Sequence, residues 1–553
     1  MDGREPVHKT PAVMFLFPNF QRDMPVFRLT SAVEPSYMVF TDGRRYYVKN
    51  GSTGVTEYSD VDASSVINYA IKRATSIGGG KVLIKSGKYY LDNQILIQNA
   101  SDVVIEGEGW NTKLIATNPD QNIIKIGERL PLVYDPQNLS VVKRVVIRNL
   151  FIDGSAQGST DNNTNSVNFD GRIGIEVVGN FEDVVIENCY IYNTGSDGVF
   201  MIWYGENKGN LAVINNVFDS IRGYYGAFHV HGTSKHKAIV AFNQFFNLKT
   251  HAIRHGYVIM GNYVEGVDFT GTYHETYGDD FAILGSDDAN IIAFNWIRNV
   301  TGGGIAFWNG GLYNGTRAII SGNVVWNVTK QGIIATGKTG YIGRVIISDN
   351  VIWSTGSEGI YAGYYAMGWI IKGNYVENAG THGINVDGCL YCTVEGNVVL
   401  DPSRNGDGAG SGIRVSGVGI MLIGNHVRVT SDPRPSFGIV IGSNADVRIV
   451  GGSIVSDVGF TVATVGIGTG SVVEIKDVYG YRTRNSGVAT ISAGSTRVTV
   501  SHNLATTPTK VLITPLATPP GKLWVENITA TSFDIATDTA PTADLQVAWY
   551  AEV

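Results

Sequence analysis

Two pairs of adjacent aspartates stand on either side of a short apolar stretch in the middle of the chain. Asp279 and Asp280 precede the stretch 281–284, and Asp287 and Asp288 follow it. Two carboxylates hydrolyse a glycosidic bond when one protonates the leaving oxygen and the other activates water or attacks the sugar. Aspartates also bind calcium, and they are frequent in turns. The first pair is therefore a candidate acid and base, whereas the second pair suits a turn or a cation site.

Histidines and an arginine upstream of these aspartates offer a different chemistry. They are His229, His231, Arg254 and His255. An imidazole changes protonation near neutral pH, so it is suited to removing a proton. The proton next to a uronate carboxylate is easier to remove when a cation, either arginine or calcium, neutralises that carboxylate. A polysaccharide lyase acting by β-elimination, with calcium as an optional cofactor, is thus the alternative to a hydrolase, which needs no cofactor.

These candidates lie within a repeating pattern of glycine or alanine followed by an apolar residue. The steps between neighbouring dipeptides run from 22 to 30 residues. The dipeptides begin at Gly174, Gly198, Ala227, Ala252, Ala282, Gly304, Gly332, Gly359, Gly383, Gly412, Gly438 and Gly466. Such a period predicts stacked units, each of which buries its apolar side chains only against a neighbour. We interpret each unit as one coil of a parallel β-helix, a solenoid.

An asparagine recurs in step with the dipeptide, after one apolar strand and before the next. These residues are Asn188, Asn216, Asn243, Asn262, Asn295, Asn323, Asn350, Asn374, Asn397 and Asn425. Asparagine tolerates left-handed backbone angles, and stacked amides can hydrogen-bond along the axis of the helix. We therefore expect a structural ladder of asparagines at one corner of every coil.

The alternation of side chains along each strand predicts which residues face outward. The outward set is Glu176, Phe200, Ile202, His229, His231, Arg254, Asp279, Asp280, Trp308, Thr336, Tyr361, Asn385, Asp387, Arg414 and Ser416, with Lys338 and Tyr364 just past their strands. The same rule points His255 inward. At about 4.8 Å per coil, the strip from His229 to Asp387 is roughly 30 Å long.

This strip is the predicted glycan groove, because a solvated strand face would otherwise carry mainly Thr, Ser, Asn and Lys. Aromatic rings pack on sugars, while acids and arginines bind hydroxyls or uronates. The catalytic candidates are Asp279, Asp280, His229, His231 and Arg254. The substrate-binding candidates are Trp308, Lys338, Tyr361, Tyr364, Asn385, Asp387, Arg414 and Glu176.

The two ends of the coil region differ from its middle in their sequence pattern. Asp62 is placed to cap a helix, and the glycines at 78–80 are placed to end it. Beyond residue 484, alternating strands with Thr- and Pro-rich turns predict a small antiparallel β-sandwich. We therefore divide the chain into an N-terminal extension (1–54), a capped β-helix (55–484) and a sandwich module (485–553).

Composition narrows the classes of partner. The chain of 553 residues has a formal net charge of −7, which argues against binding of nucleic acid. It has 68 glycines but no run approaching the roughly 20 apolar residues of a membrane helix, so no membrane insertion is expected. The N-terminal residues lack the basic-then-apolar order of a signal peptide.

The two ladders and the opening GGGKVLIKSGKYYL…VVIEGEGWNTKLI resemble right-handed parallel β-helix proteins of the pectate-lyase superfamily over roughly residues 55–480. The C-terminal segment is similar to sandwich modules that end viral tail spikes and fibres. This resemblance implies an extracellular protein that binds a polysaccharide and forms a homotrimer.

The stretch GDDFAI resembles the GDD-containing strand of polygalacturonases, which implies that Asp279 and Asp280 are the acid and base, with Asp197 or Asp387 as partners. The flanking THAIRHG and TGGGIAF depart from the polygalacturonase pattern. We expect depolymerisation of another glycan by hydrolysis, with β-elimination as the first alternative. A non-catalytic glycan-binding spike or adhesin is the second alternative.

Overall fold

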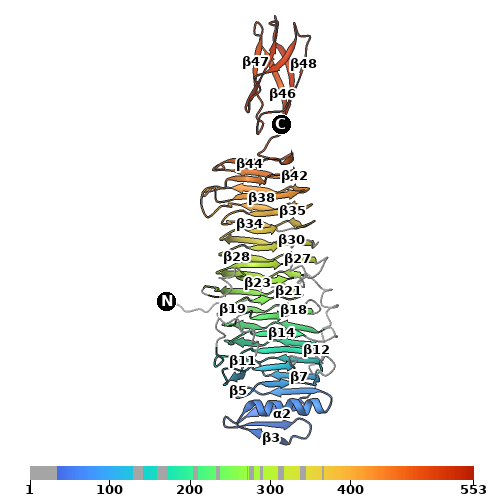
Figure 1. The fold of residues 1–553 in the computed structure, drawn as a ribbon, viewed down its shortest axis with the longest axis vertical. Coiled ribbons are helices and arrows are strands. Elements are labelled where there is room, and N and C mark those ends of the chain that lie inside the picture. Colours follow the sequence, from blue (N-terminus) through green and yellow to red (C-terminus); the bar gives the residue numbers. More distant parts are fainter. Residues whose placement is uncertain are drawn as a thin grey trace.

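The protein is a long stack of parallel β-coils, as the sequence predicts, with a helix at one end and a separate β-module at the other (Figure 1). The computed structural model describes residues 34–128, 141–158, 171–203, 209–223, 225–231, 237–270, 272, 279–286, 291–308, 317–336, 344–363 and 366–553. Among these residues, no helix is long and apolar enough to cross a lipid bilayer.

Each coil contributes one strand to each of three parallel sheets, A, B and C. In one coil, β17 (Phe228–His231) belongs to sheet C, β18 (Lys237–Ala241) to sheet A and β19 (Gln244–Leu248) to sheet B. The next coil supplies β20 (Ile253–Arg254), β21 (Val258–Met260) and β22 (Tyr263–Val267) in the same order. The side chains of one coil therefore lie directly over those of the next.

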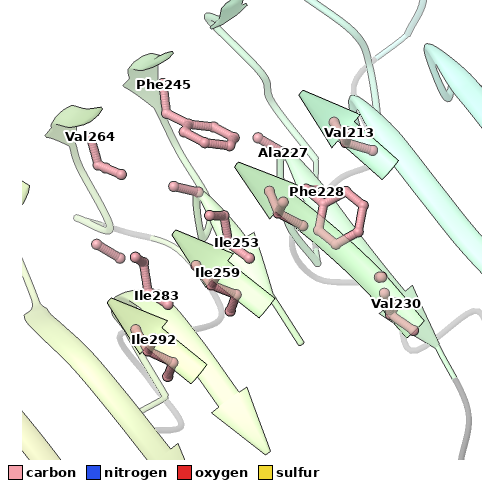
Figure 2. Close-up of a cluster of buried hydrophobic side chains, with 14 of the residues drawn as sticks. Val213, Ala227, Phe228, Val230, Phe245, Ile253, Ile259, Val264, Ile283 and Ile292 are labelled. Carbon is pink, nitrogen blue, oxygen red and sulfur yellow. The ribbon is translucent and has the colours of Figure 1, made fainter. Parts of the chain in front are cut away.

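The core is a set of apolar columns that run along the axis of the helix. Figure 2 shows Phe228, Ile253 and Ile283 stacked from sheet C, facing Ile259 and Ile292 from sheet A. All five side chains are buried. Because a coil alone leaves its apolar side chains uncovered above and below, the stack is stable only when neighbouring coils cover one another.

The recurring position is glycine or alanine because neighbouring coils leave little room there, and the room at the glycines is too small even for a Cβ atom. A Cβ atom on Gly332 would stand 2.5 Å from Cγ2 of Ile352 and 2.7 Å from the carbonyl oxygen of Gly359. A Cβ on Gly383 would meet Val399 at 2.3 Å. The dipeptide thus marks the place where each coil turns tightly into sheet C.

The predicted asparagine ladder runs without interruption from Asn216 to Asn425, and every member is buried. Asn323 shows the pattern. Its Nδ2 donates to Oδ1 of Asn350 (2.9 Å) and to the carbonyl of Ile292 (2.9 Å), and its Oδ1 accepts from both nitrogens of Asn295 (3.0 Å each). Both donors and both lone pairs of the amide are used, so the buried polar group is fully satisfied.

The expected reason for asparagine at this corner is corrected in one respect. The left-handed residue is the one before the ladder asparagine, such as Gly322 (φ 66°) before Asn323 or Phe294 (φ 56°) before Asn295. Asn188 occupies this preceding position (φ 54°), and the ladder position of its coil is taken by Cys189, whose N–H donates to Oδ1 of Asn216. Asparagine is required for its amide, not for its backbone angles.

The N-terminal end of the stack is closed by α2 (Ala63–Ser76), which the sequence predicts. Asp62 caps it, with its side chain accepting from the N–H groups of Ser64 and Ser65. Its buried residues include Val66, Ile67, Ala70, Ile71 and Ala74, and Gly78 follows its end with φ of 90°. Before the helix, β1 (Tyr37–Thr41), β2 (Tyr46–Asn50) and β3 (Thr56–Asp60) pair antiparallel, and β1 also pairs with β4 (Gly80–Ile84) in sheet A.

The C-terminal module consists of two three-stranded antiparallel sheets. One contains β46 (Arg484–Ile491), β51 (Leu545–Glu552) and β48 (Lys510–Pro515), and the other β47 (Arg497–Ser501), β50 (Ser532–Thr537) and β49 (Leu523–Glu526). Phe533 and Trp549 meet edge to face at 5.6 Å in a core of its own. The module lies beyond the last coils (Figure 1).

We expect Asn323→Ala to lower the free energy of unfolding by about 2–4 kcal/mol, because it leaves buried N–H and carbonyl groups of neighbouring coils without partners. Urea unfolding followed by circular dichroism measures the loss. Asn111→Ala is the matched control, since Asn111 is exposed in a turn. A loss at Asn323 no larger than that of the control would contradict a structural role for the ladder.

Candidate active site on sheet C

The outward residues of sheet C form one continuous row, which we call the outer row. Each member is the register partner of the next in the adjacent coil: Glu176, Phe200, His229, Arg254, Leu284, Ala306, Ile334, Tyr361, Asn385 and Arg414. The middle of the row is apolar, because Leu284 and Ala306 pack with Phe281, Trp308 and Ile334. The polar residues therefore fall into two separate groups.

The outer row is far less exposed than the sequence suggests. Within the row, Glu176 is 0 %, Phe200 0 %, His229 2 % and Asn385 3 % exposed, and Asp280, which the sequence also predicts to face outward, is 1 % exposed. The predicted solvent-exposed face is thus wrong for these residues. Alternation along a strand gives direction only, and here neighbouring coils pack large or hydrogen-bonded side chains against the row. Glu176, for example, accepts from Nδ2 of Asn122 at 2.8 Å and lies 3.7 Å from Nζ of Lys125.

The first polar group, the histidine cluster, consists of Asp197, Tyr225, His229, His231, Arg254, His255 and Asp279. His229 is at its centre. Its Nδ1 lies 3.3 Å from Oδ2 of buried Asp197, and the other oxygen of that carboxylate accepts from the N–H of Gly226 (3.1 Å). The ring of Tyr225 stacks on His229 at 4.8 Å, and His231 meets it edge-on at 5.8 Å. A buried carboxylate that contacts one ring nitrogen fixes the orientation of an imidazole.

Arg254 lies in the coil after His229 and is held from two sides. Its guanidinium sits over the ring of Tyr225 at 5.2 Å, and its Nη1 is 3.8 Å from Oδ2 of Asp279. The side chain is 20 % exposed and that of Asp279 15 %. A partly exposed guanidinium with a fixed position is suited to binding a carboxylate.

His255 reaches the same cluster through an unusual backbone angle. Strict alternation would place it inside the helix, but its φ of 64° breaks the alternation, and its ring lies 6.2 Å from that of His229. Burial, together with the neighbouring charges of His229, Arg254 and His231, lowers the pKa of His255 well below its usual value. The ring is therefore neutral at pH 7, and it is a weaker base than an ordinary imidazole. A left-handed angle at a histidine is uncommon and often marks a functional site.

The two aspartates of the predicted acid–base pair have different surroundings. Asp279 faces Arg254, whereas Asp280 is buried and bonds Nζ of Lys330 at 2.5 Å through Oδ1. Burial raises the pKa of Asp280 above its usual value even though Lys330 opposes the shift. Both carboxylates thus contact cations, Asp279 through Arg254 and Asp280 through Lys330.

The second polar group lies around Glu358, one residue before the glycine of its coil. Its Oε1 accepts from Asn385 (3.3 Å) and its Oε2 from Gln331 (3.3 Å). Nδ1 of His382 accepts from the N–H of Ser411, so the hydrogen of a neutral ring is on Nε2. Burial and the charge of Arg414 lower the pKa of His382. Beside this group, Asp387 accepts from the hydroxyl of Ser416 at 2.7 Å.

Several predicted site residues fall outside this description. Lys338 and Tyr364, and the possible calcium ligands Asp287 and Asp288, lie outside the described residues. Within the described ranges, no three or more His, Cys, Asp or Glu residues are arranged to hold a metal ion. Calcium remains a prediction tied to the lyase alternative.

The sequence interpretation does not identify two members of these groups, and it assigns a third to a different role. Tyr225 and Glu358 were not recognised, and Asp197 was considered only as a partner of the aspartates. Asp197 and Glu358 each stand immediately before the glycine of the repeat. A carboxylate immediately before the glycine of the repeat is the signal that could have identified both.

Comparisons with known proteins support the architecture. The tailspike protein of E. coli bacteriophage HK620, solved as a mutant in complex with a pentasaccharide, aligns with TM-score 0.51 and 11% identity over 89% of this chain and 90% of that one. The tailspike protein gp49 of Pseudomonas phage LKA1 aligns with TM-score 0.39 and 11% identity over 88% and 92% of the two chains. The A-module of the Azotobacter vinelandii mannuronan C-5 epimerase AlgE6 gives 0.32 and 13% over 74% and 95%.

The family model of the periplasmic copper-binding protein NosD matches residues 259–458. No curated protein sequence matches the chain. The similarity to the HK620 tailspike spans nearly the whole of both chains, so the two share a fold. The protein is a parallel β-helix protein with a tailspike-like architecture.

The neutral imidazoles predict how stability depends on pH. Because the folded-state pKa values of His255 and His382 lie below the ordinary value of 6.5, the unfolded chain binds protons first as pH falls. Stability should be complete above pH 6.5 and decline below it, by up to about 1.4 kcal/mol per pH unit for each ring. Carboxylates with ordinary or lowered pKa values act only at lower pH, below about 4.5. Asp280, whose pKa is raised by burial, takes up its proton earlier in the folded chain and so opposes part of this decline.

The double variant His255→Asn, His382→Asn should flatten this decline between about pH 6.5 and about pH 5. Asparagine is chosen because it tolerates the left-handed angle at residue 255. Urea midpoints across the range measure the effect, and His426→Asn, at an exposed position in β40 (His426–Val429), is the control. Parallel curves for the double variant and the parent would contradict the proposed cause.

Proposed function

We propose that this protein binds a long polysaccharide along the outer row of sheet C and acts on it at the histidine cluster. The shared fold with a tailspike whose structure contains a pentasaccharide supports this proposal. The row from His229 to Asn385 spans six coil steps, which is about 29 Å at about 4.8 Å each and fits several sugar rings.

The reaction that fits the histidine cluster is removal of the proton next to a uronate carboxylate. The observation that carries this inference is a neutral imidazole, His255, beside a fixed guanidinium, Arg254. Arg254 binds and neutralises the substrate carboxylate, which stabilises the carbanion that forms. His255 accepts the C5 proton. His229, which Asp197 orients, lies at the centre of the cluster and holds the surrounding side chains in position.

Elimination then completes the reaction without consuming water. The electron pair of the C5–H bond forms a C4=C5 double bond, the C4–O bond breaks, and the leaving oxygen takes a proton from Tyr225 or His231. The products are an unsaturated sugar and a new reducing end. If the leaving group stays in place and a proton returns to the opposite face of C5, the result is epimerisation.

The test is incubation with alginate, polygalacturonate and neutral glycans, followed by absorbance near 235 nm, reducing-end assays and NMR in D2O. Elimination gives absorbance and reducing ends in equal amounts, and epimerisation gives deuterium at C5. His255→Asn and Arg254→Gln should each lower kcat/KM by about 10²–10⁴. The controls are His426→Asn and Arg428→Gln, because both side chains are exposed on sheet B. Uronans left unchanged in all three assays would overturn the proposal.

Hydrolysis is the second candidate, and the raised pKa of Asp280 favours it, because a general acid must be protonated. New reducing ends without absorbance at 235 nm would identify this route. In that case Asp280→Asn should abolish activity. Under elimination, Asp280→Asn leaves activity largely intact, and Asp279→Asn reduces it only by releasing Arg254. If the protein is a binding shaft without catalysis, it should retain a glycan and form no product.

We also propose that the chain is a homotrimer located on a virion or cell surface or in the periplasm. The similarity to a tailspike and the match to a periplasmic family support the location. Exposed apolar side chains on the C-terminal module, Val488 (56 %), Leu512 (53 %) and Leu516 (55 %), support self-association.

Light scattering of the intact protein should give three times the 59.6-kDa mass of the chain. Val488→Ser together with Leu512→Ser should shift the mass toward that of one chain, because burial of these side chains would stabilise the trimer. A parent protein with the mass of one chain would contradict the trimer.

A further inference from the structure

The outward face of sheet B carries an unusual set of aromatic side chains, far from the chemistry of sheet C. The relevant strands are β22, β25 (Trp296–Val300), β28 (Val324–Val328), β31 (Val351–Thr355) and β34 (Tyr375–Glu377). Register aligns them in two columns, Tyr263–Trp296–Val324–Val351–Tyr375 and Glu265–Arg298–Trp326–Trp353–Glu377. We call these two columns the aromatic face.

Two of the three indoles of the aromatic face are open to solvent, and the third, Trp353, is half-buried. Trp296 is 43 % and Trp326 42 % exposed, which is unusual for the largest apolar side chain. The core behind them is complete without them, because Ile297 and Val325 already fill the interior positions. Exposed indoles that the core does not need mark a binding surface.

Polar partners fix the side chains that flank the tryptophans. The hydroxyl of Tyr263 donates to Glu265 at 2.6 Å, and the hydroxyl of Tyr375 donates to Glu377 at 2.8 Å. Arg298 bonds Glu265 at 2.7 Å and lies over the ring of Tyr263 at 5.5 Å. Side chains held in this way lose little further entropy when a ligand binds.

A column of exposed amides runs beside the rings. Asn299 and Asn327 both have left-handed backbones, with φ of 56° and 55°, which interrupts the alternation of their strands. Nδ2 of Asn327 donates to Oδ1 of Asn299 at 2.9 Å. Each amide therefore keeps donor and acceptor capacity for hydroxyl groups beside the indoles.

We propose that the aromatic face binds a neutral polysaccharide laid along the axis of the β-helix. The indoles stack on the apolar faces of the sugar rings, and the amides and carboxylates bond the hydroxyls. Coils repeat at about 4.8 Å, so the rings and polar groups of successive coils are presented at regular intervals along an extended sugar chain.

Charge selects a neutral polymer for this face. Glu377 is bonded to Tyr375, and Glu265 shares Arg298, so the two columns carry more carboxylates than cations and repel a polyuronate. The ligand thus differs from that of sheet C, and this inference does not rest on the reaction proposed there. A contact with a second copy of the chain fits less well, because charged pairs and amides interrupt the apolar surface.

The test uses the intact protein in native gels that contain dextran, xylan, galactomannan or mixed-linkage β-glucan, with polygalacturonate for comparison. At least one neutral polymer should retard the protein and quench its tryptophan fluorescence. Trp326→Ala with Trp353→Ala should weaken that binding at least tenfold. Trp524→Ala is the control, since this indole is also 40 % exposed but belongs to the C-terminal module. The double variant Arg254→Gln, His255→Asn should bind the neutral polymer as the parent does.

Three results would overturn the proposal. The first is no retardation by any of the four neutral polymers. The second is a mass, by light scattering, that falls in the Trp326→Ala, Trp353→Ala variant, because the face would then be a contact between copies. The third is retardation that the sheet C variant abolishes and the tryptophan variant does not, because the histidine cluster would then be the binding site. None of these results depends on whether any glycan is cleaved.

Discussion

The stack of buried asparagine amides is the constraint on which the rest of the molecule depends. Each amide bonds the coil before it and the coil after it, so a coil cannot slip by one residue without leaving buried donors and acceptors unpaired. A slip of one residue would also turn every inward side chain outward. The ladder and the apolar columns therefore enforce the same register.

A fixed register turns side chains that are distant in the sequence into close neighbours. His229 and Arg254 are register partners, although 25 residues separate them. The surroundings of a residue are set more by the coils above and below than by its neighbours in the chain. Asp279 and Asp280 illustrate this, because one contacts Arg254 and the other contacts Lys330 from a later coil.

The sequence predicts the repeat well, because its period, its small residue and its asparagine each have one physical cause. The sequence predicts the capping helix equally well, because Asp62 and the apolar positions of α2 act locally. Prediction fails where the backbone leaves its regular path. The left-handed angle at His255 turns its side chain toward the outer row, and no glycine at that position announces the angle. Prediction also fails at Asn188, where the backbone follows the regular corner but the ladder position after it holds Cys189 instead of asparagine.

The burial of the outer row could not be predicted strand by strand, and the reason is different. Whether His229 is exposed depends on the sizes of Phe200, Tyr225 and His231, which lie in its own and a neighbouring coil. The alternation rule treats each strand alone, so it does not include the sizes of these neighbouring side chains. It identifies the row of candidate site residues, but their accessibility and pairing follow only from the stacked coils.

The same register gives sheets B and C different chemistries on one rigid body. Sheet C presents imidazoles and a guanidinium next to the carboxylates of Asp197 and Asp279, and sheet B presents indoles and amides next to tyrosine–carboxylate pairs. Because both proposed binding faces are fixed to the same coils, a polymer bound on sheet B would raise the effective concentration of a linked or co-assembled polymer at sheet C. The gain requires no movement of the protein, since the ladder already holds the two faces at a constant separation. A rigid shaft with two such faces is suited to a surface that contains two kinds of glycan. One kind would anchor the protein through sheet B, and the other would be the substrate at sheet C.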